Sequence, residues 1–139
     1  MNVTNPDMIR AVTSKWDGER DANGRPLVSD DILERMKLVT TEEAWGTCKR
    51  NDYHFQFAGD WMNLHPGRVI VGRAVTCRWV PRRPDVHDSI DKQGEEDDRV
   101  GFQNSWVIDE LEQGDLIVVD LFGKIYNGTF AGDNLATAI

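Results

Sequence analysis

The stretch GDLIVVDLFGKIYNGTFAGDNLATAI, residues 114–139, decides how the rest of the chain is interpreted. Gly114-Asp115 predicts a turn, and LIVVDLF (116–122) is a near-continuous apolar run, as expected for a strand covered on both faces. GKIYNG predicts a second turn, and a short helix is expected to begin near Gly132 or Asp133. Asp120, at the end of the apolar run, either supplies a functional group at the strand end or caps the following turn.

The glycines of GTFAGDNLATAI suggest a ligand-binding loop. Glycine lets the backbone approach a ligand closely, and the free N–H groups at a helix N-terminus bind anions. One interpretation is therefore a carboxylate or phosphate cradle built by the amides of Gly132 to Ala136. The alternative is a capped turn with Asp133 as the cap. The spacing is that of neither a Walker loop nor a G-x-G-x-x-G fingerprint.

Upstream, RVIVGRAVTCRWV (68–80) predicts a second strand, with a bulge or close backbone approach at its interior Gly72. Arg73 lies within this strand, so its charge must face water, a subunit interface or a site. The run PRRPDVHDSIDKQGEEDD (81–98) is predicted to be a flexible acidic connection, and residues 99–112 a helix. Arg78, Arg82 and Arg83 either bind an anionic group or form a solvated strand end.

The N-terminal part predicts mainly helices. Residues 1–29 are interpreted as an arm with a short amphipathic helix at 6–16, and residues 29–39 as a helix with an apolar stripe. Thr40 or Thr41 then caps a further helix, whose acidic first turn and basic last turn complement the helix dipole. Residues 53–67 are expected to be an irregular aromatic loop packed on the domain.

These elements do not make a complete sheet. Two strands rarely form an independent sheet, and a helix ending at Ile139 is marginal without tertiary support. The sequence therefore favours an incomplete α/β domain, with the missing part in further sequence or in a second chain.

Composition limits the function classes. The 139 residues carry a net charge of −8, which disfavours binding to nucleic acid. No apolar run is long enough to span a membrane, and the first ten residues lack a secretory pattern, so we expect a cytoplasmic protein. Cys48 and Cys77 are expected to be reduced structural thiols, and the spacing of His54, His65 and His87 does not predict a metal site.

Three segments, taken in order, resemble the RraA-like family: the helices around TTEEAWG, then VGRAVTCRWVP, then residues 114–139. The resemblance covers about residues 35–139. It rests on Gly72-x-Ala74-x-Thr76, on Gly114-Asp115 before the strand ending in Asp120, and on Gly132-Asp133-Asn134-Leu135-Ala136. It implies a swivelling β/β/α domain like the phosphohistidine domain, here residues 30–139, which assembles as trimers or hexamers. The arm (1–29) and the 81–98 insertion suggest a larger branch of the family.

The resemblance also implies a site. In the family an Asp is followed, after twenty residues, by Arg-Asp; Asp133 matches the first position, and the pair would fall beyond Ile139. The direct ligand of a Mg²⁺ or Mn²⁺ ion is therefore expected outside this chain. Asp133 would be catalytic, by positioning water or relaying a proton. Gly132, Asn134 and Leu135 would bind the carboxylate of a 2-oxo acid, with Arg73 and Arg78 as further candidates.

The function that the resemblance implies is that of a metal-dependent lyase, an aldolase or decarboxylase of small 2-oxo acids that passes through a stabilised enolate. The first alternative is a non-catalytic protein of the RraA type, which binds an RNA-degradation enzyme and regulates it. A second alternative is a different lyase or hydrolase on the same scaffold.

Overall fold

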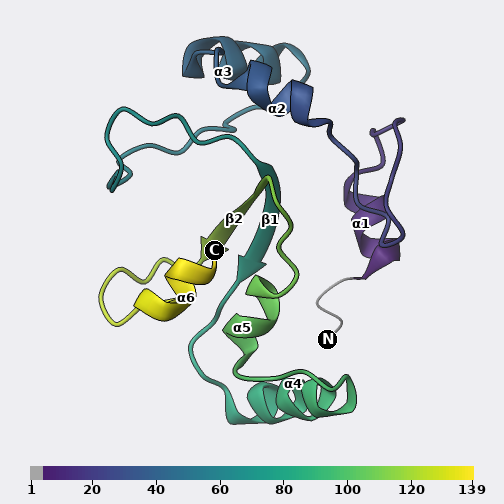
Figure 1. The fold of residues 1–139 in the computed structure, drawn as a ribbon, viewed down its shortest axis with the longest axis vertical. Helices are drawn as coiled ribbons and strands as arrows, with labels where there is room; N and C mark the ends of the chain where they lie inside the picture. The colour runs from purple at the N-terminus through teal and green to yellow at the C-terminus, as the bar shows by residue number, and fades with distance from the viewer. Residues whose placement is uncertain (1–4) are drawn as a thin grey trace. The chain divides into compact units, whose positions relative to one another are not determined.

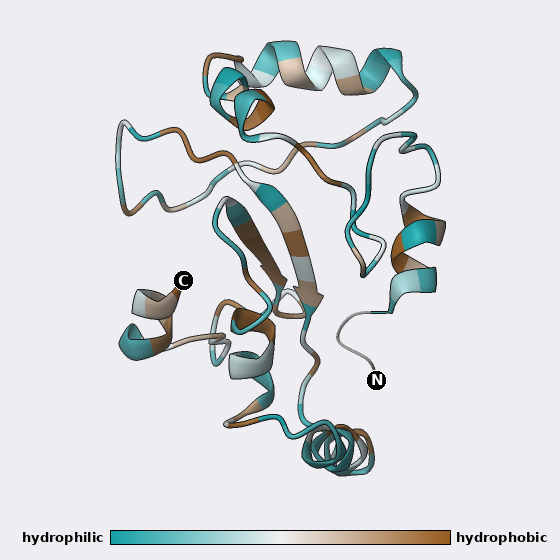
Figure 2. Ribbon diagram, turned by 45° about the vertical axis from the view of Figure 1, so that its right-hand side comes forward, coloured by the Kyte–Doolittle hydropathy of each residue, from teal (hydrophilic) through white to brown (hydrophobic). Residues whose placement is uncertain are grey.

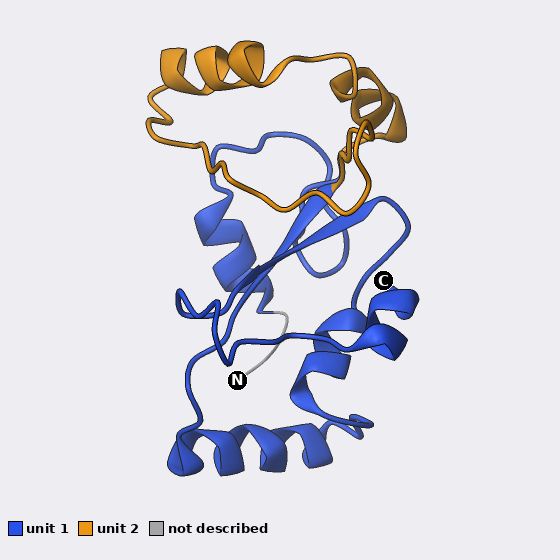
Figure 3. Ribbon diagram, turned by 90° about the vertical axis from the view of Figure 1, so that its left-hand side faces the viewer, with its two compact units in different colours: residues 1–27, 73–139 blue, residues 28–72 orange. Residues whose placement is uncertain are grey.

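The computed structural model describes residues 5–139 and combines helices with a parallel pair of strands (Figure 1). Two compact units divide the chain (Figure 3): one comprises residues up to Leu27 together with Arg73–Ile139, and the other comprises Val28–Gly72. In chain order, the elements are α1 (Pro6–Val12), α2 (Asp30–Met36), α3 (Thr41–Arg50), β1 (Arg73–Arg78), α4 (Pro84–Glu96), α5 (Gln103–Ile108), β2 (Asp115–Asp120) and α6 (Asp133–Ala138).

The two strands pair in parallel, from Arg73 opposite Asp115 to Arg78 opposite Asp120. Parallel neighbours require a crossover connection, and α4 and α5 occupy it. β1 is shorter than the strand predicted over residues 68–80, because its ladder ends where β2 ends. Consequently Gly72 precedes the strand, and the predicted interior bulge is wrong.

β2 forms where the apolar run predicts a strand, but its two faces are not equally covered. Val118 is 44% exposed, and exposure alternates along the second half of the strand. The brown, apolar residues of both strands stand out in Figure 2. The described residues therefore leave one face of β2 without the cover that the apolar run predicts.

The acidic segment 81–98 is not a loop, since most of it forms α4. Pro84 occupies the first turn, where its missing N–H costs nothing, and Val86, Ile90 and Gly94 lie on one side of the helix. The acidic residues are its solvated face, which accounts for the composition. The helix predicted over 99–112 is reduced to α5, which starts after Gly101 adopts a positive φ of 81°.

The core of the first unit is centred on α5. Trp106, Val107 and Ile108 are the buried apolar residues among those described. The indole of Trp106 packs directly over Gly94, where a side chain would collide with the ring. α5 also contacts α6, so this short helix links α4 to the C-terminal segment.

Side-chain hydrogen bonds of two arginines, Arg20 and Arg25, hold the N-terminal arm in place. α1 ends at Val12 rather than at 16, and Arg20 donates from its Nη1 and Nη2 atoms to Thr13, Trp16 and Gly24. Arg25 then reaches the start of β2. Its Nη2 and Nη1 lie 2.7 and 2.9 Å from the carboxylate oxygens of Asp115, which fastens residues 5–27 to the strands.

In the second unit, α2 and α3 form where the sequence predicts helices. The capping box of α3 is complete, because Thr40 accepts from the amide of Glu43 while the Glu43 carboxylate accepts from the amide of Thr40. These hydrogen bonds hold the pKa of Glu43 below its usual value. The loop after α3 is not packed on a domain as predicted, since Phe55 is 95% exposed and Trp61 75%.

Candidate functional site

The glycine loop enters α6 at the predicted place. Gly132 is the N-cap, and Asp133 is the first helical residue rather than the cap. The Asp133 Oδ1 atom accepts from the amide of Asn134 at 2.9 Å, and the amide of Ala136 donates to the carbonyl of Gly132 at 2.9 Å. Two of the amides expected to cradle an anion thus have partners within the helix. Leu135 is half-buried, whereas Asp133 is exposed.

Arg73 and Arg78 stand at opposite ends of β1, roughly 16 Å apart at about 3.3 Å per residue. The Arg73 Nη1 atom donates to the carbonyl of Gln113 at 3.1 Å, at the amino end of the strands. At the carboxyl end, the Nε atom of Arg78 lies 2.7 Å from Asp120. The two arginines therefore cannot bind the same small ligand from these positions.

Asp120 closes the carboxyl end of β2. Its carboxylate accepts from Arg78 and from the amide of Phe122 at 2.8 Å. These two contacts, that of Arg78 foremost, hold the pKa of Asp120 below its usual range. Asp120 thus caps the next turn, as one of its two interpretations predicted, and is paired with Arg78.

A groove of about 510 Å³ opens beyond the carboxyl ends of β1 and β2. Four segments line this strand-end groove: residues 79–82 after β1, the α4 side chains His87 and Asp91, residues 102–104 at the start of α5, and part of the 121–130 loop after β2. This is the edge at which open α/β sheets bind ligands. Gly132–Leu135, Arg73 and Arg78 do not line it.

Three polar side chains form a closed cluster on one wall of the groove. The Nε2 atom of His87 lies 3.1 Å from Asp91 Oδ2, and the Nε2 atom of Gln103 donates to Asp91 Oδ1 at 2.8 Å. Gln103 Nε2 also lies 3.4 Å from His87 Nδ1. Both ring nitrogens are therefore engaged, and the cluster ties α4 to α5.

Another part of the lining is aromatic. The rings of Trp79 and Phe130 lie 5.8 Å apart between centroids and are inclined by 50°. Asn104 Nδ2 donates to the carbonyl of Phe130 at 2.7 Å, which holds the loop after β2 against α5. The groove therefore has an apolar wall whose position is fixed by a hydrogen bond.

Sequence reasoning missed the cluster because it assigned residues 81–98 to a loop. In a loop the spacing of His87 and Asp91 carries no information, whereas in a helix residues four apart lie on the same face. Pro84 at the helix start, followed by apolar residues at helical spacing, was the signal in the sequence that could have revealed α4.

Metal-ligating side chains do not cluster among the described residues. Within residues 5–139, no three His, Cys, Asp or Glu side chains gather in a way that could hold a metal ion. Asp133, the matched family position, is exposed and bonded to its own helix.

The two cysteines are free: Cys48 lies in α3 and Cys77 in β1. Burial raises the pKa of the Cys77 thiol, which keeps it protonated. In the part of the chain that the structure describes, no helix is long and apolar enough to cross a bilayer. No family model matches the chain, and neither a curated protein nor a solved structure matches it.

Proposed function

We propose that this chain carries part of the active site of a metal-dependent lyase that cleaves or decarboxylates a small 2-oxo acid. One observation carries the proposal: β2 is followed by a glycine loop that enters α6 at Gly132-Asp133-Asn134, in the order that the RraA-like resemblance implies. The first turn of α6 presents backbone amides, and among the described residues those of Asp133 and Leu135 have no hydrogen-bond partner and are available to a carboxylate.

Asp133 is the residue of this chain proposed for proton transfer. Its carboxylate is exposed to solvent and, among residues 5–139, is hydrogen-bonded only to the next amide, so it can accept a proton from a bound ligand or from water. The family pattern places the substrate-binding arginine and the metal-binding aspartate 21 and 22 residues after Asp133, outside residues 5–139. The proposal includes assembly as a trimer or hexamer, and a cytoplasmic location.

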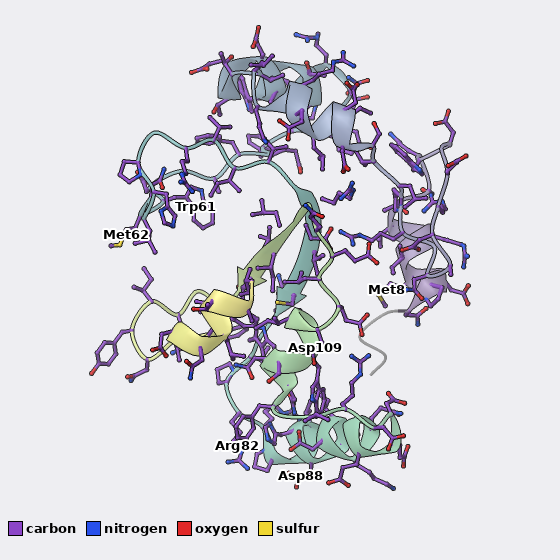
Figure 4. All side chains as sticks on the ribbon, viewed as in Figure 1. Met8, Trp61, Met62, Arg82, Asp88 and Asp109 are labelled. Carbon is purple, nitrogen blue, oxygen red and sulfur yellow. The ribbon has the colours of Figure 1, made fainter. Side chains whose placement is uncertain are left out.

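The test compares two carboxylates of this chain in the native assembly. Asp133→Asn is expected to lower Mg²⁺-dependent release of pyruvate from 4-hydroxy-4-methyl-2-oxoglutarate or oxaloacetate by about 10²-fold or more, the range lost with a general acid or base. Asp88→Asn in α4 makes the same change of charge at an exposed residue (Figure 4) and is expected to leave the rate unchanged. Equal rates for both variants would exclude the proposed role of Asp133.

A second candidate is a protein-binding regulator without catalytic activity. The observation that favours it is the run of large apolar side chains exposed between residues 53 and 64, because exposed apolar patches mark interaction surfaces. Trp61 and Met62 are labelled there in Figure 4. Replacing both by Ser would abolish partner binding under this alternative, and would leave pyruvate release intact under the lyase proposal.

A further inference from the structure

We propose that the strand-end groove binds a small organic anion, namely a singly charged carboxylate attached to an aromatic or apolar body. The groove excludes Gly132, Asp133, Asn134 and Leu135. The inference therefore does not rest on the proposed lyase activity, and it assigns a binding site to different residues.

Two cations of the groove have no acidic partner in the part of the chain that the structure describes. Arg82 follows β1 and Lys124 follows β2, so they reach the groove from two different segments. Neither lies within ion-pair distance of a carboxylate among residues 5–139, whereas the neighbouring Arg78 and Arg83 are paired with Asp120 and Asp85. In a chain with a net charge of −8, this leaves a local excess of positive charge at one groove.

The acidic side chain of the lining, Asp91, offsets only one of these two positive charges. Asp91 is the carboxylate among the described lining residues, and both of its oxygens have partners: Oδ2 lies by His87 and Oδ1 accepts from Gln103. Arg82 and Lys124 are thus the charges left available to a ligand. A ligand carboxylate can pair with them without displacing a contact that holds α4 to α5.

The aromatic wall favours a ligand whose uncharged part is apolar or aromatic. Trp79 and Phe130 are half-buried and offer their rings to the groove, with Phe130 held in place through its carbonyl by Asn104. A volume of about 510 Å³ lies within the range of small-molecule sites. An apolar body against the rings and a carboxylate near the cations use both features of the groove together.

A cavity in the second unit provides the contrast. It has a volume of about 600 Å³ and is lined by Thr41, Glu42, Trp45, Phe55 and Phe57. It is also aromatic, but its charged lining residue is a glutamate, which repels an anion. The two cavities therefore differ in the sign of their charge, and the proposal requires the anion to choose the strand-end groove.

The test is a titration of the full chain with phenylacetate, followed through backbone and indole N–H signals in ¹H–¹⁵N spectra. Phenylacetamide, which has the same shape without the charge, is the control ligand. Phenylacetate is expected to shift the signals of Trp79, Gly128 and Phe130, and to bind more tightly than the amide by about fivefold for each cation engaged, the scale of an exposed ion pair. Its affinity is expected to fall as salt is added.

Charge-removing variants locate the site. Arg82→Gln and Lys124→Gln change exposed side chains and are each expected to weaken phenylacetate binding about fivefold, with little effect on phenylacetamide. Arg68→Gln is the matched control, since Arg68 is an exposed arginine of the second unit that likewise has no acidic partner among the described residues. It is expected to leave binding unchanged.

Several results would overturn the proposal: no shifts at millimolar phenylacetate, equal binding of the amide, shifts centred on Trp45 and Phe57, or equal weakening by Arg68→Gln. Failure of the lyase proposal gives a different result. A native assembly that releases no pyruvate, but binds phenylacetate at the groove, contradicts the lyase and leaves this site standing.

Discussion

Arg25 and Asp115 form the most buried ion pair among the described residues. Their side chains are 22% and 2% exposed, and the guanidinium contacts both carboxylate oxygens. Burial raises the pKa of Asp115, but the hydrogen bonds from Arg25 and from the Glu112 amide outweigh it and leave the pKa below its usual value. One bidentate contact thus connects the N-terminal arm to the first residue of β2.

Removal of this contact is predicted to be costly. Arg25→Ala leaves a buried carboxylate with a single remaining hydrogen bond from the Glu112 amide, so we expect the free energy of unfolding to fall by about 2 to 4 kcal/mol. Arg83→Ala is the matched control, because its partner Asp85 is 66% exposed, and only a small loss of stability is expected there. Urea denaturation of the two variants measures both values, and equal losses would contradict the role given to the pair.

The same pair predicts a pH dependence. Since the folded protein holds the pKa of Asp115 below its unfolded value of about 3.9, its contribution is present above that pH and is lost as the pH falls through the folded pKa. The wild-type chain is therefore expected to exceed Asp115→Asn in stability at pH 7, and the difference is expected to shrink at pH 3. Urea denaturation at the two pH values measures this difference in the free energy of unfolding. A difference that grows toward pH 3 would contradict the predicted pH dependence.

At the scale of elements, helix α4 depends on a glycine at its contact with α5. Gly94 lies under the indole of Trp106, where an added methyl group would overlap the ring. Gly46 in α3 has open space instead, with only the tip of the Arg50 side chain at van der Waals distance. The same substitution should therefore act in opposite directions in the two helices.

Gly94→Ala is predicted to destabilise the chain by about 1 to 3 kcal/mol through overpacking. Gly46→Ala is predicted to stabilise α3 by up to about 1 kcal/mol, because alanine is the better helix former. Thermal unfolding followed by circular dichroism compares them. A stabilising Gly94→Ala would show that the packing of Trp106 on α4 is wrong.

The elements also show what the sequence can predict. Capping letters and apolar spacing located α2, α3 and α6, and the apolar run located β2, because these signals are local. Other features depend on non-local contacts: the length of β1 depends on its partner strand, and the exposure of Val118 depends on what covers the sheet. The acidic face of α4 gave its sequence the composition of a loop. The strand-end groove could not be predicted, since it joins residues from Trp79 to Phe130 through the crossover.

At the scale of the whole molecule, much apolar surface is left uncovered. Large hydrophobic residues are exposed in both compact units, among them Phe55, Trp61, Phe102 and Ile125. Monomeric proteins rarely leave extended apolar patches in water, and partner surfaces are the usual reason for them. The proposed trimer offers such surfaces between copies of the chain.

The mass of the assembled particle is therefore predicted to equal that of three or six chains. This mass is expected to stay constant when the protein concentration is varied in the micromolar range. Light scattering coupled to size-exclusion chromatography measures that mass. The double variant Trp61→Ser and Met62→Ser tests whether the exposed loop takes part in assembly. A change in particle mass would place this loop in the interface between copies of the chain. A wild-type particle of one chain would contradict the assembly proposed with the lyase.

The lyase proposal is tested most directly by the release of pyruvate. The native assembly, supplied with 4-hydroxy-4-methyl-2-oxoglutarate or oxaloacetate, is predicted to release pyruvate when Mg²⁺ or Mn²⁺ is present, to lose that activity in a chelator, and to recover it when the ion is restored. Absence of pyruvate from both substrates, in an assembly that is folded and supplied with either ion, would contradict the account.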